Sequence, residues 1–231
     1  MNILVANDDG ILTDGIKALV SELSESYRVY IIAPDRERSA AAHSITLNSP
    51  LRVDEVEPKY GAIRSWAVSG TPGDCVKIGV SAILKDDEKP DLVISGINHG
   101  PNLGHDIIYS GTVSCAIEGA MMNIPSIAVS LNSYKPQFED FKFSAKFIDS
   151  LIPKLKDFTF PEKSVLNINI PGIPQEDITG VAVTEMGGRM FTDNYEKRID
   201  PRGNTYYWMA GKLSTEKEKE NTDIYAIRQN K

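Results

Sequence analysis

Residues 3–10 are Ile3-Leu4-Val5-Ala6-Asn7-Asp8-Asp9-Gly10, so four apolar residues run directly into two adjacent carboxylates. The apolar run predicts a buried strand, and Gly10 allows the backbone to turn sharply at its end. In open α/β sheets, ligands bind at the carboxyl ends of the strands. Because Asp8 and Asp9 repel each other there, they predict a divalent cation bound by hard oxygen ligands, close to an anionic substrate. The alternative is an exposed acidic turn, since Asp is common in turns.

Strand and helix patterns alternate along the first two thirds of the chain. Short apolar runs predict strands, and apolar residues at helical spacing predict helices. One helix start is marked by Thr71-Pro72-Gly73-Asp74, a capping-box pattern with proline at the first helical position. The strands are expected at 3–6, 29–33, 92–95, 127–131 and 165–170, and the helices at 16–23, 72–83, 113–121 and 143–155. This order predicts a three-layer α/β/α fold, with a mostly parallel sheet covered by helices on both faces.

The last quarter of the sequence has a different character. It contains two short extended pieces, 181–184 and 205–209, and a charge run at 216–220 that we interpret as a solvated loop. We therefore expect an α/β core at 1–175 and a C-terminal extended segment at 176–231 that belongs to the same functional unit.

The formal net charge of −7 argues against broad electrostatic binding to DNA, RNA or an anionic membrane. No apolar run approaches the roughly 20 residues of a membrane span, and the N-terminus lacks the basic start of a signal peptide. Cys75 and Cys115 each lie in a helix-like apolar segment, so we interpret both as reduced core residues. These features predict a cytoplasmic protein and leave room for a small anionic substrate.

The second polar segment, at 33–39, follows the second strand and lies on the same edge of the predicted sheet. Ser39 offers a hydroxyl oxygen that would complete an oxygen shell around a cation. Arg36 and Arg38 would either meet a phosphate or pair with the acidic residues beside them. His43, just beyond, is open between a polar contact and a catalytic role.

The third segment, residues 95–112, is rich in glycine and asparagine and connects a buried strand to a helix. Long glycine-rich loops of compact domains are usually functional, because they permit close approach to a ligand. Asn98 supplies a neutral oxygen suited to Mg²⁺, Mn²⁺ or Ca²⁺. Ser110-Gly111-Thr112 stands at a helix N-terminus, where free N–H groups and the helix dipole favour a phosphate. The alternative is a structural loop closed by an ordinary threonine cap.

Other histidines and aromatic residues carry weaker signals. His99 and His105 share the third segment, but their spacing is not that of a zinc site, and we interpret them as loop residues. Trp66, Trp208 and Tyr206-Tyr207 are interpreted as packing or subunit contacts rather than as a base-stacking platform.

Three strand-to-helix loops thus present oxygen ligands from one edge of one sheet, and a shared metal site is their simplest joint explanation. The expected ligands are Asp8, Asp9, Ser39 and Asn98. Because an anion site is expected at the neighbouring helix start, the pattern predicts phosphoryl chemistry.

These segments closely resemble the SurE family, the stationary-phase survival proteins that are metal-dependent 5′-nucleotidases. The resemblance covers nearly the whole chain, and its motifs are long and ordered. They are Asn7–Gly10, Ala33–Arg36 with Arg38-Ser39, Gly70–Pro72, Ser95–Asn98, Tyr109–Val113, and Asp200–Thr205 with Tyr207-Trp208.

The resemblance implies a Rossmann-like α/β domain, with a smaller β-rich C-terminal part that joins subunits into a homodimer or homotetramer. It implies one divalent metal per subunit, held by the four ligands named above, and hydrolysis of nucleoside monophosphates. Family members usually continue beyond the segment at Thr222-Asp223, whereas this sequence stops at Lys231, so the arrangement of subunits stays open.

The expected reaction is metal-assisted hydrolysis of a phosphomonoester by direct attack of water, with Mg²⁺ or Mn²⁺ as the metal. Asp8 is the candidate catalytic residue, either orienting or deprotonating the water or serving only as a ligand. Ser110, Gly111 and Thr112 are expected to bind the phosphate oxygens with help from Asn102. The sequence does not separate 5′ from 3′ nucleotides.

Three other functions compete with this interpretation. A phosphoreceiver also has an acidic pair after its first strand, but it needs an aspartate after its third strand and a lysine after its fifth, where Ser95-Gly96 and Asn132 stand here. A haloacid-dehalogenase-type phosphatase would use Asp-x-Asp in place of Asp8-Asp9. A nucleotide sensor with vestigial turnover is the third alternative.

Overall fold

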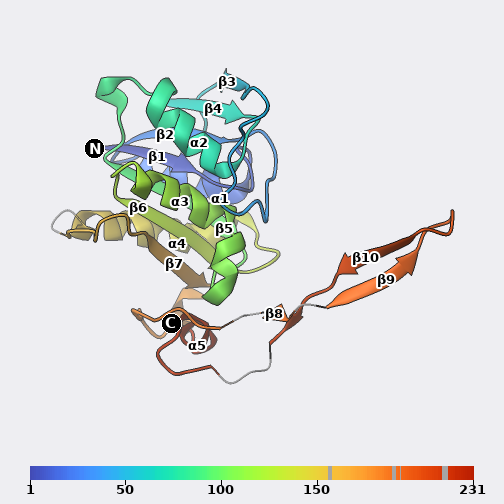
Figure 1. The fold of residues 1–231 in the computed structure, drawn as a ribbon. Coiled ribbons are helices and arrows are strands. Elements are labelled where there is room, and N and C mark those ends of the chain that lie inside the picture. The colour runs from blue at the N-terminus through green and yellow to red at the C-terminus, as the bar shows by residue number, and fades with distance from the viewer. Residues whose placement is uncertain (156–157, 189–190, 193, 215–217) are drawn as a thin grey trace.

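The structure, a computed structural model, describes residues 1–155, 158–188, 191–192, 194–214 and 218–231. Its body is a seven-stranded sheet with the strand order β3-β4-β2-β1-β5-β6-β7 (Figure 1). The strands are β1 (Asn2–Ala6), β2 (Arg28–Pro34), β3 (Val53–Val56), β4 (Arg64–Val68), β5 (Leu92–His99), β6 (Ser126–Asn132) and β7 (Leu166–Pro171). All neighbouring pairs are parallel except β3 and β4. The predicted mostly parallel sheet is confirmed.

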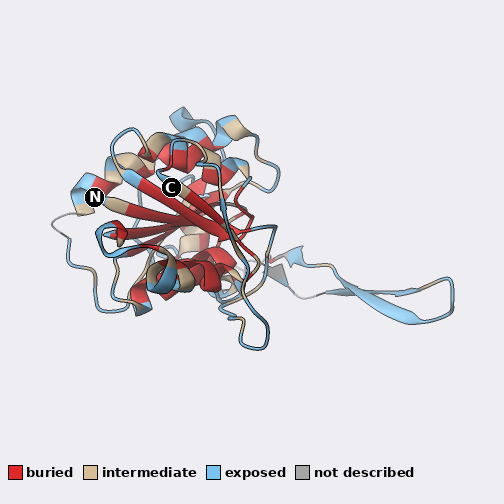
Figure 2. Ribbon diagram, turned by 90° about the horizontal axis from the view of Figure 1, so that it is seen from above, coloured by how far each residue is buried: buried red, intermediate tan, exposed pale blue. Residues whose placement is uncertain are grey.

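Helices cover both faces of this sheet, as predicted. They are α1 (Asp14–Leu23), α2 (Pro72–Ile78), α3 (Gly111–Met121) and α4 (Phe138–Leu151). The alternation of side chains along β1 divides the core: Ile3 and Val5 pack with α1 and α4, whereas Leu4 and Ala6 pack with α2 and α3. Seen from above, the buried strands lie between two helical layers (Figure 2). The fold is therefore a three-layer, Rossmann-like α/β/α arrangement.

The strand order places a topological switch point beside β1. From β1 the chain builds β2 and β4 on one side, then returns to build β5, β6 and β7 on the other. The crevice between the carboxyl ends of β1 and β5 is where ligands of such sheets bind. The segments that follow these two strands are those that the sequence singled out for chemistry.

Several predicted boundaries differ from the structure. The helix expected at 72–83 is α-helical only to Ile78 and continues as a π-helical turn over Gly79–Ile83. The helix expected at 143–155 is α4, which begins at Phe138 and passes into a 3₁₀ turn after Leu151. The capping box at Thr71 and Asp74 is confirmed.

The sequence did not predict β3 and β4. Trp66 of β4 is buried, with the Arg64 guanidinium 4.5 Å above its ring, which confirms a packing role for this tryptophan. β3 is an edge strand with the charged sequence Val53-Asp54-Glu55-Val56, so it lacks the apolar run that identifies a strand in sequence.

The C-terminal part is only partly as predicted. The extended piece at 205–209 is β10 (Thr205–Met209), which pairs with β9 (Tyr195–Ile199) in an exposed hairpin that projects from the body (Figures 1 and 2). No strand forms at 181–184, so that prediction was wrong; Val181 and Val183 are exposed. A further short pair joins β8 (Phe191–Thr192) to β11 (Lys212–Leu213). The charge run predicted at 216–220 lies partly outside the described residues.

The last helix, α5 (Asp223–Arg228), returns to the body and supports the glycine-rich segment. Ile224 and Ile227 pack against Leu103, and the Asp223 carboxylate accepts hydrogen bonds from the backbone N–H groups of Gly104 and Gly187. Sequence reasoning did not foresee this contact between segments about 120 residues apart.

Two expectations from composition can be checked directly. Cys75 and Cys115 are free and buried, which confirms that they are core residues without a disulfide. Among the described residues, no helix has both the length and the apolar character needed to span a bilayer.

Candidate active site

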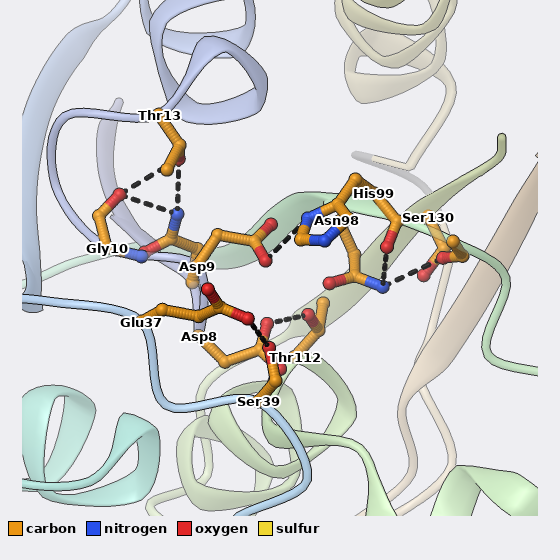
Figure 3. Close-up of polar contacts among 12 residues, drawn as sticks. Asp8, Asp9, Gly10, Thr13, Glu37, Ser39, Asn98, His99, Thr112 and Ser130 are labelled. Atoms are coloured by element: carbon orange, nitrogen blue, oxygen red, sulfur yellow. Dashed lines mark hydrogen bonds and ion pairs between the residues drawn. The ribbon is translucent and has the colours of Figure 1, made fainter. Parts of the chain in front are cut away.

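The acidic loop after β1 is held by Asn7, which is completely buried. Its side-chain oxygen accepts from Gly10 N at 3.1 Å, and its side-chain nitrogen donates to Gly10 O at 3.0 Å and to Thr13 Oγ1 at 3.1 Å. Gly10 has φ of +109°, a conformation that side chains rarely adopt. The Asn7 side chain therefore closes the turn and fixes the two carboxylates that lie inside it (Figure 3).

Asp8 and Asp9 are both buried, with 4% and 6% of their surfaces exposed. Burial and the neighbouring charge of Asp9 raise the pKa of Asp8 to about 6, although the Thr112 hydroxyl donates a hydrogen bond to Asp8 Oδ1. Two adjacent buried carboxylates, of which Asp8 tends to hold a proton, form an electrostatic setting that a divalent cation would relieve. The alternative of an exposed acidic turn is excluded by the burial.

Asp9 has a partner that the sequence did not predict. His99 Nδ1 lies 2.7 Å from Asp9 Oδ1, and this contact raises the pKa of His99 (Figure 3). The histidine occupies the position directly after Asn98, at the end of β5. It faces the acidic loop because β1 and β5 are neighbours in the sheet, which sequence spacing alone does not reveal.

Ser39 lies in the loop after β2, near Asp8 (Figure 3). The backbone N–H of Arg38 donates to Asp8 O at 2.7 Å, which holds this loop against the acidic loop. The Ser39 hydroxyl donates to Glu37 Oε1 at 2.7 Å. Glu37 is thus a third carboxylate at the site, after Asp8 and Asp9, which the sequence interpretation had treated only as a possible partner for arginine.

Asn98 lies across the crevice from the acidic loop. A bulge in β5 between Ser95 and Asn98 shifts its register against β6, and such irregularities re-aim side chains beside functional sites. The side-chain nitrogen of Asn98 donates to the carbonyl oxygens of His99, at 3.2 Å, and Gly100, at 2.8 Å. Its amide oxygen is therefore turned toward the two aspartates (Figure 3).

The N-terminus of α3 closes the other side of the site. Ser110 is its N-cap, and the Ser110 hydroxyl accepts from Val113 N at 3.1 Å. A Cβ atom on Gly111 would lie 2.6 Å from Asp8 Cβ, so the helix start approaches the acidic loop this closely only because residue 111 is glycine. The structure thus brings the predicted phosphate cradle directly beside the predicted metal ligands.

Asn102 has a different environment. It is 9% exposed, and its side-chain nitrogen donates to Ser130 Oγ at 2.7 Å. Its backbone oxygen accepts from the side chains of Asn167 and Asn169, both at 2.9 Å. These contacts anchor the glycine-rich segment to β6 and β7, and a phosphate contact of Asn102 stays a prediction.

The remaining polar candidates have partners within the protein. Arg36 and Arg38 form ion pairs with Asp35 at 3.9 and 3.7 Å, as one of the two interpretations of this loop expected. His43 Nε2 lies 3.0 Å from Oε2 of the buried Glu118. His43 therefore makes a polar contact away from the acidic loop.

The donor set fits a hard cation. In the part of the chain that the structure describes, no three His, Cys, Asp or Glu side chains cluster in a way that could hold a metal. The candidate set instead combines the carboxylates of Asp8 and Asp9 with the Ser39 hydroxyl and the Asn98 amide. All four supply oxygen, which Mg²⁺, Mn²⁺ and Ca²⁺ prefer.

Residues 3–193 match the family model described as Survival protein SurE. The chain is 50% identical over 231 residues to 5′-nucleotidase SurE of Pelotomaculum thermopropionicum and 46% identical over 229 residues to that of Carboxydothermus hydrogenoformans, covering 99% and 98% of this chain and 86% of each relative. The crystal structure of the SurE protein from Aquifex aeolicus superposes with a TM-score of 0.84 at 40% identity, covering 100% of this chain and 90% of that one. The chain described here therefore belongs to the SurE family.

Proposed function

We propose that the protein is a 5′-nucleotidase that hydrolyses nucleoside monophosphates with the help of a divalent metal. The observation that carries this proposal is the buried Asp8–Asp9 pair at the topological switch point, in which Asp8 contacts the N-terminus of α3. A cation site and an anion site in contact are what metal-assisted hydrolysis of a phosphate ester requires. The relatives at 50% and 46% identity are named 5′-nucleotidases, which supports the nucleotide substrate.

Asp8, Asp9, Ser39 and Asn98 would hold the metal, for which Mg²⁺ or Mn²⁺ is the best match to four oxygen donors. When bound, such a cation supplies positive charge that polarises the phosphoryl group and favours ionisation of the attacking water. Without the cation, the buried acidic pair would make this edge of the crevice strongly negative and would repel a phosphate. The cation would therefore also be needed for the substrate to bind.

The residues of α3 would bind the phosphate. The N–H groups of Gly111 and Thr112 lie in the first turn of the helix, where they are not used by intrahelical hydrogen bonds. They stabilise negative charge on the phosphate oxygens together with the helix dipole. Ser110 caps the helix and sets its direction, and Asn102 holds the preceding loop in place.

Asp8 is the candidate to handle the proton of the attacking water. Thr112 donates to its Oδ1, whereas Oδ2 lies beside Gly111, at the start of the phosphate cradle. We propose that Oδ2 orients the water and accepts its proton. The Ser39 hydroxyl, which has the Glu37 carboxylate beside it, is assigned here as a metal ligand, so we propose direct attack of water rather than a covalent intermediate.

We further propose that residues 1–175 form the catalytic core and residues 176–231 mediate assembly into a homodimer or homotetramer. The exposed β9–β10 hairpin supports this proposal, because Tyr195, Ile199 and Trp208 lie on it with more than half of their surfaces exposed. The two buried free thiols support action in a reducing compartment, the cytoplasm. Light scattering on the purified protein tests the subunit number, and a monomer would contradict the assembly proposal.

The test of the nucleotidase function is a phosphate-release assay over nucleoside 5′- and 3′-monophosphates. The protein is treated with EDTA and then supplied with single metals. We expect turnover to vanish with EDTA and to return with Mg²⁺ or Mn²⁺. Turnover that is indifferent to EDTA, or an absence of turnover with every nucleotide and metal, would overturn the proposal.

A further inference from the structure

The acidic loop faces two different environments on the two sides of the sheet. Asp8 contacts Thr112 and Gly111 of α3, whereas the next residue, Asp9, lines a pocket of about 270 Å³ on the side of α1 and α4. Besides Asp9, the pocket is lined by Asp14 at the start of α1, His99 after β5, and residues of the segment that leads from β6 into α4. The predicted phosphate cradle and this pocket therefore lie on opposite sides of the same pair of carboxylates.

We propose that this pocket is the subsite that binds the nucleoside part of the substrate. The inference rests on the proposed nucleotidase function and deepens it. A phosphate bound at the start of α3, beside Asp8, directs its ester oxygen, and the group attached to it, away from that helix. The pocket beside Asp9 is the hollow on the opposite side, and the group released by hydrolysis would occupy it.

The chemistry of the lining fits a nucleoside. Asp14 is exposed in the first turn of α1 and offers a carboxylate that can accept hydrogen bonds from sugar hydroxyl groups. Lys135 and His99, which also line the pocket, offer hydrogen-bond donors. Each hydroxyl group of a sugar both donates and accepts hydrogen bonds. A sugar therefore matches a lining that contains both acceptors and donors.

The same pocket offers aromatic surface for a base. Phe141, which is buried, and Tyr134, which is 56% exposed, both line it. The Tyr134 ring also lies against Gly100 of the active-site loop, where a Cβ atom would come 3.4 Å from Tyr134 Cε1. Because every nucleobase has a stacking face, an exposed aromatic ring here binds different bases with little selectivity.

A second phosphate is a poorer occupant. Asp9 and Asp14 both lie in the lining, and two carboxylates oppose an additional anion in the absence of a cation. A purely apolar ligand is also disfavoured, since charged and polar side chains make up much of the wall. The volume is slightly below the roughly 300 Å³ at which small-molecule pockets begin, which fits one part of a substrate rather than a whole cofactor.

The test compares substrates that differ in the group attached to phosphate. The unmodified protein, Asp14→Asn and Tyr134→Ala are each assayed with adenosine 5′-monophosphate, ribose 5-phosphate and p-nitrophenyl phosphate. A hydrogen bond to a charged acceptor is roughly twice as strong as one to a neutral acceptor, and replacing the Asp14 carboxylate by an amide therefore corresponds to about a tenfold change. We therefore expect Asp14→Asn to lower kcat/KM for the two sugar phosphates about tenfold relative to p-nitrophenyl phosphate. Tyr134→Ala should lower the ratio of the nucleotide to ribose 5-phosphate by a similar factor.

The matched control is Glu139→Gln, which changes a carboxylate in the first turn of α4, outside this pocket. It should leave all three substrate ratios as they are in the unmodified protein. Thermal unfolding of each variant shows whether the fold is retained. Equal losses with all three substrates in a folded Asp14→Asn protein would overturn the subsite.

Failure of the proposed function would look different. If the unmodified protein hydrolyses none of the three substrates with any metal, the nucleotidase assignment fails, and the pocket is then tested alone by calorimetric titration with adenosine. Adenosine binding that is weakened about tenfold by Asp14→Asn would still support the subsite. Adenosine binding of equal strength in both proteins, or no binding to either, would contradict it.

Discussion

Gly111, the first residue of α3, lies against Asp8, the first carboxylate after β1. A methyl group on Gly111 would stand 2.6 Å from Asp8 Cβ and 2.8 Å from Asp8 Oδ2. Both distances are well below ordinary contact, so either the helix or the acidic loop would have to move. The absence of a side chain at residue 111 thus sets the spacing between the predicted phosphate cradle and the predicted metal ligands.

Gly111→Ala is therefore expected to impair catalysis more than folding. Overpacking of this kind typically costs about 1–3 kcal/mol, and a shift of 1 Å at a reacting centre can cost about 100-fold in rate. We expect a loss of about 100-fold in kcat/KM for adenosine 5′-monophosphate, measured beside the melting temperature.

The control for this change is Gly73→Ala, which alters the second residue of α2. A Cβ atom there would meet its nearest neighbour, Ser44 O, at an ordinary distance of 3.4 Å. It should leave activity close to that of the unmodified protein. Equal activities of the two alanine variants would show that the contact between Gly111 and Asp8 does not set the active-site geometry.

Asp8→Asn is expected to abolish metal-dependent turnover and to stabilise the metal-free protein. The pKa of Asp8 is raised to about 6 in the folded chain from an ordinary value of 3.8, so the folded state loses stability as the pH rises between these values. At pH 8 Asp8 is ionised in both the folded and the unfolded state, and its full destabilisation of the folded state is present, ~3 kcal/mol. Asparagine removes this cost and still accepts a hydrogen bond from Thr112.

The measurement is thermal unfolding at pH 8 in EDTA and again with Mg²⁺ or Mn²⁺. The unmodified protein should melt at a lower temperature than the variant in EDTA and should gain stability when metal is added. The variant should respond little to metal. A variant that melts at a lower temperature in EDTA and still gains stability with metal would contradict a role of Asp8 as a metal ligand.

Much of the fold could be predicted from the sequence because β1, β2, β5 and β6 contain apolar runs, with turn residues and amphipathic helices between them. Parallel strands that are covered on both faces bury most of their side chains, and this leaves a clear signal. β3 and β4 left no such signal: β3 is an edge strand whose central residues are Asp54 and Glu55. An edge strand tolerates charged side chains, so the sequence of β3 lacks the apolar run by which a strand is recognised.

The part of the candidate site that could be predicted consists of residues that directly follow strands, because parallel strands end at the same edge of the sheet. Asp8, Asp9 and Asn98 meet because β1 and β5 are neighbours, and topology rules favour that placement. The contact of His99 with Asp9 and the Asp223 contact with Gly104 depend on side-chain directions and on the path of a distant segment. Periodicity in a single sequence carries no information on either.

Asp74 is expected to make stability depend on acidic pH. Burial raises the pKa of this carboxyl group, but hydrogen bonds from Thr46 and Thr71 outweigh burial, so the net shift is downward. A carboxylate with a lowered pKa stabilises the folded state above its unfolded pKa of about 3.9, and this contribution is lost as the pH falls through the folded value. At pH 7 Asp74→Asn should therefore be less stable by about 1 kcal/mol.

Denaturant unfolding between pH 7 and pH 3 checks this expectation. The stability difference between the unmodified protein and Asp74→Asn should be constant down to about pH 4 and should shrink below it. Asp177→Asn, at an exposed carboxylate in a 3₁₀ turn, is the control. If the difference for Asp74→Asn stays constant to pH 3, the hydrogen bonds from Thr46 and Thr71 do not favour the ionised form.

Glu118 on α3 is expected to hold the loop that carries Ser39. Its side chain is 3% exposed, and it accepts from Lys77 Nζ at 2.7 Å on α2 and faces His43 Nε2 at 3.0 Å on that loop. Glu118→Gln keeps the size of the side chain but removes the charge that joins these elements. Because Lys77 is half exposed and partly screened, we expect a loss of about 1–3 kcal/mol in unfolding free energy.

The control is Glu196→Gln, which removes one partner of the exposed ion pair between Glu196 and Arg198 at 3.0 Å on the β9–β10 hairpin. An exposed pair contributes about 0–1 kcal/mol, so this variant should unfold at nearly the same denaturant concentration as the unmodified protein. Glu118→Gln should also weaken metal binding, since Ser39 is in the loop that His43 anchors, and calorimetric titration with Mn²⁺ measures that effect. Equal unfolding midpoints and equal Mn²⁺ affinities for the two variants would show that Glu118 does not position the loop.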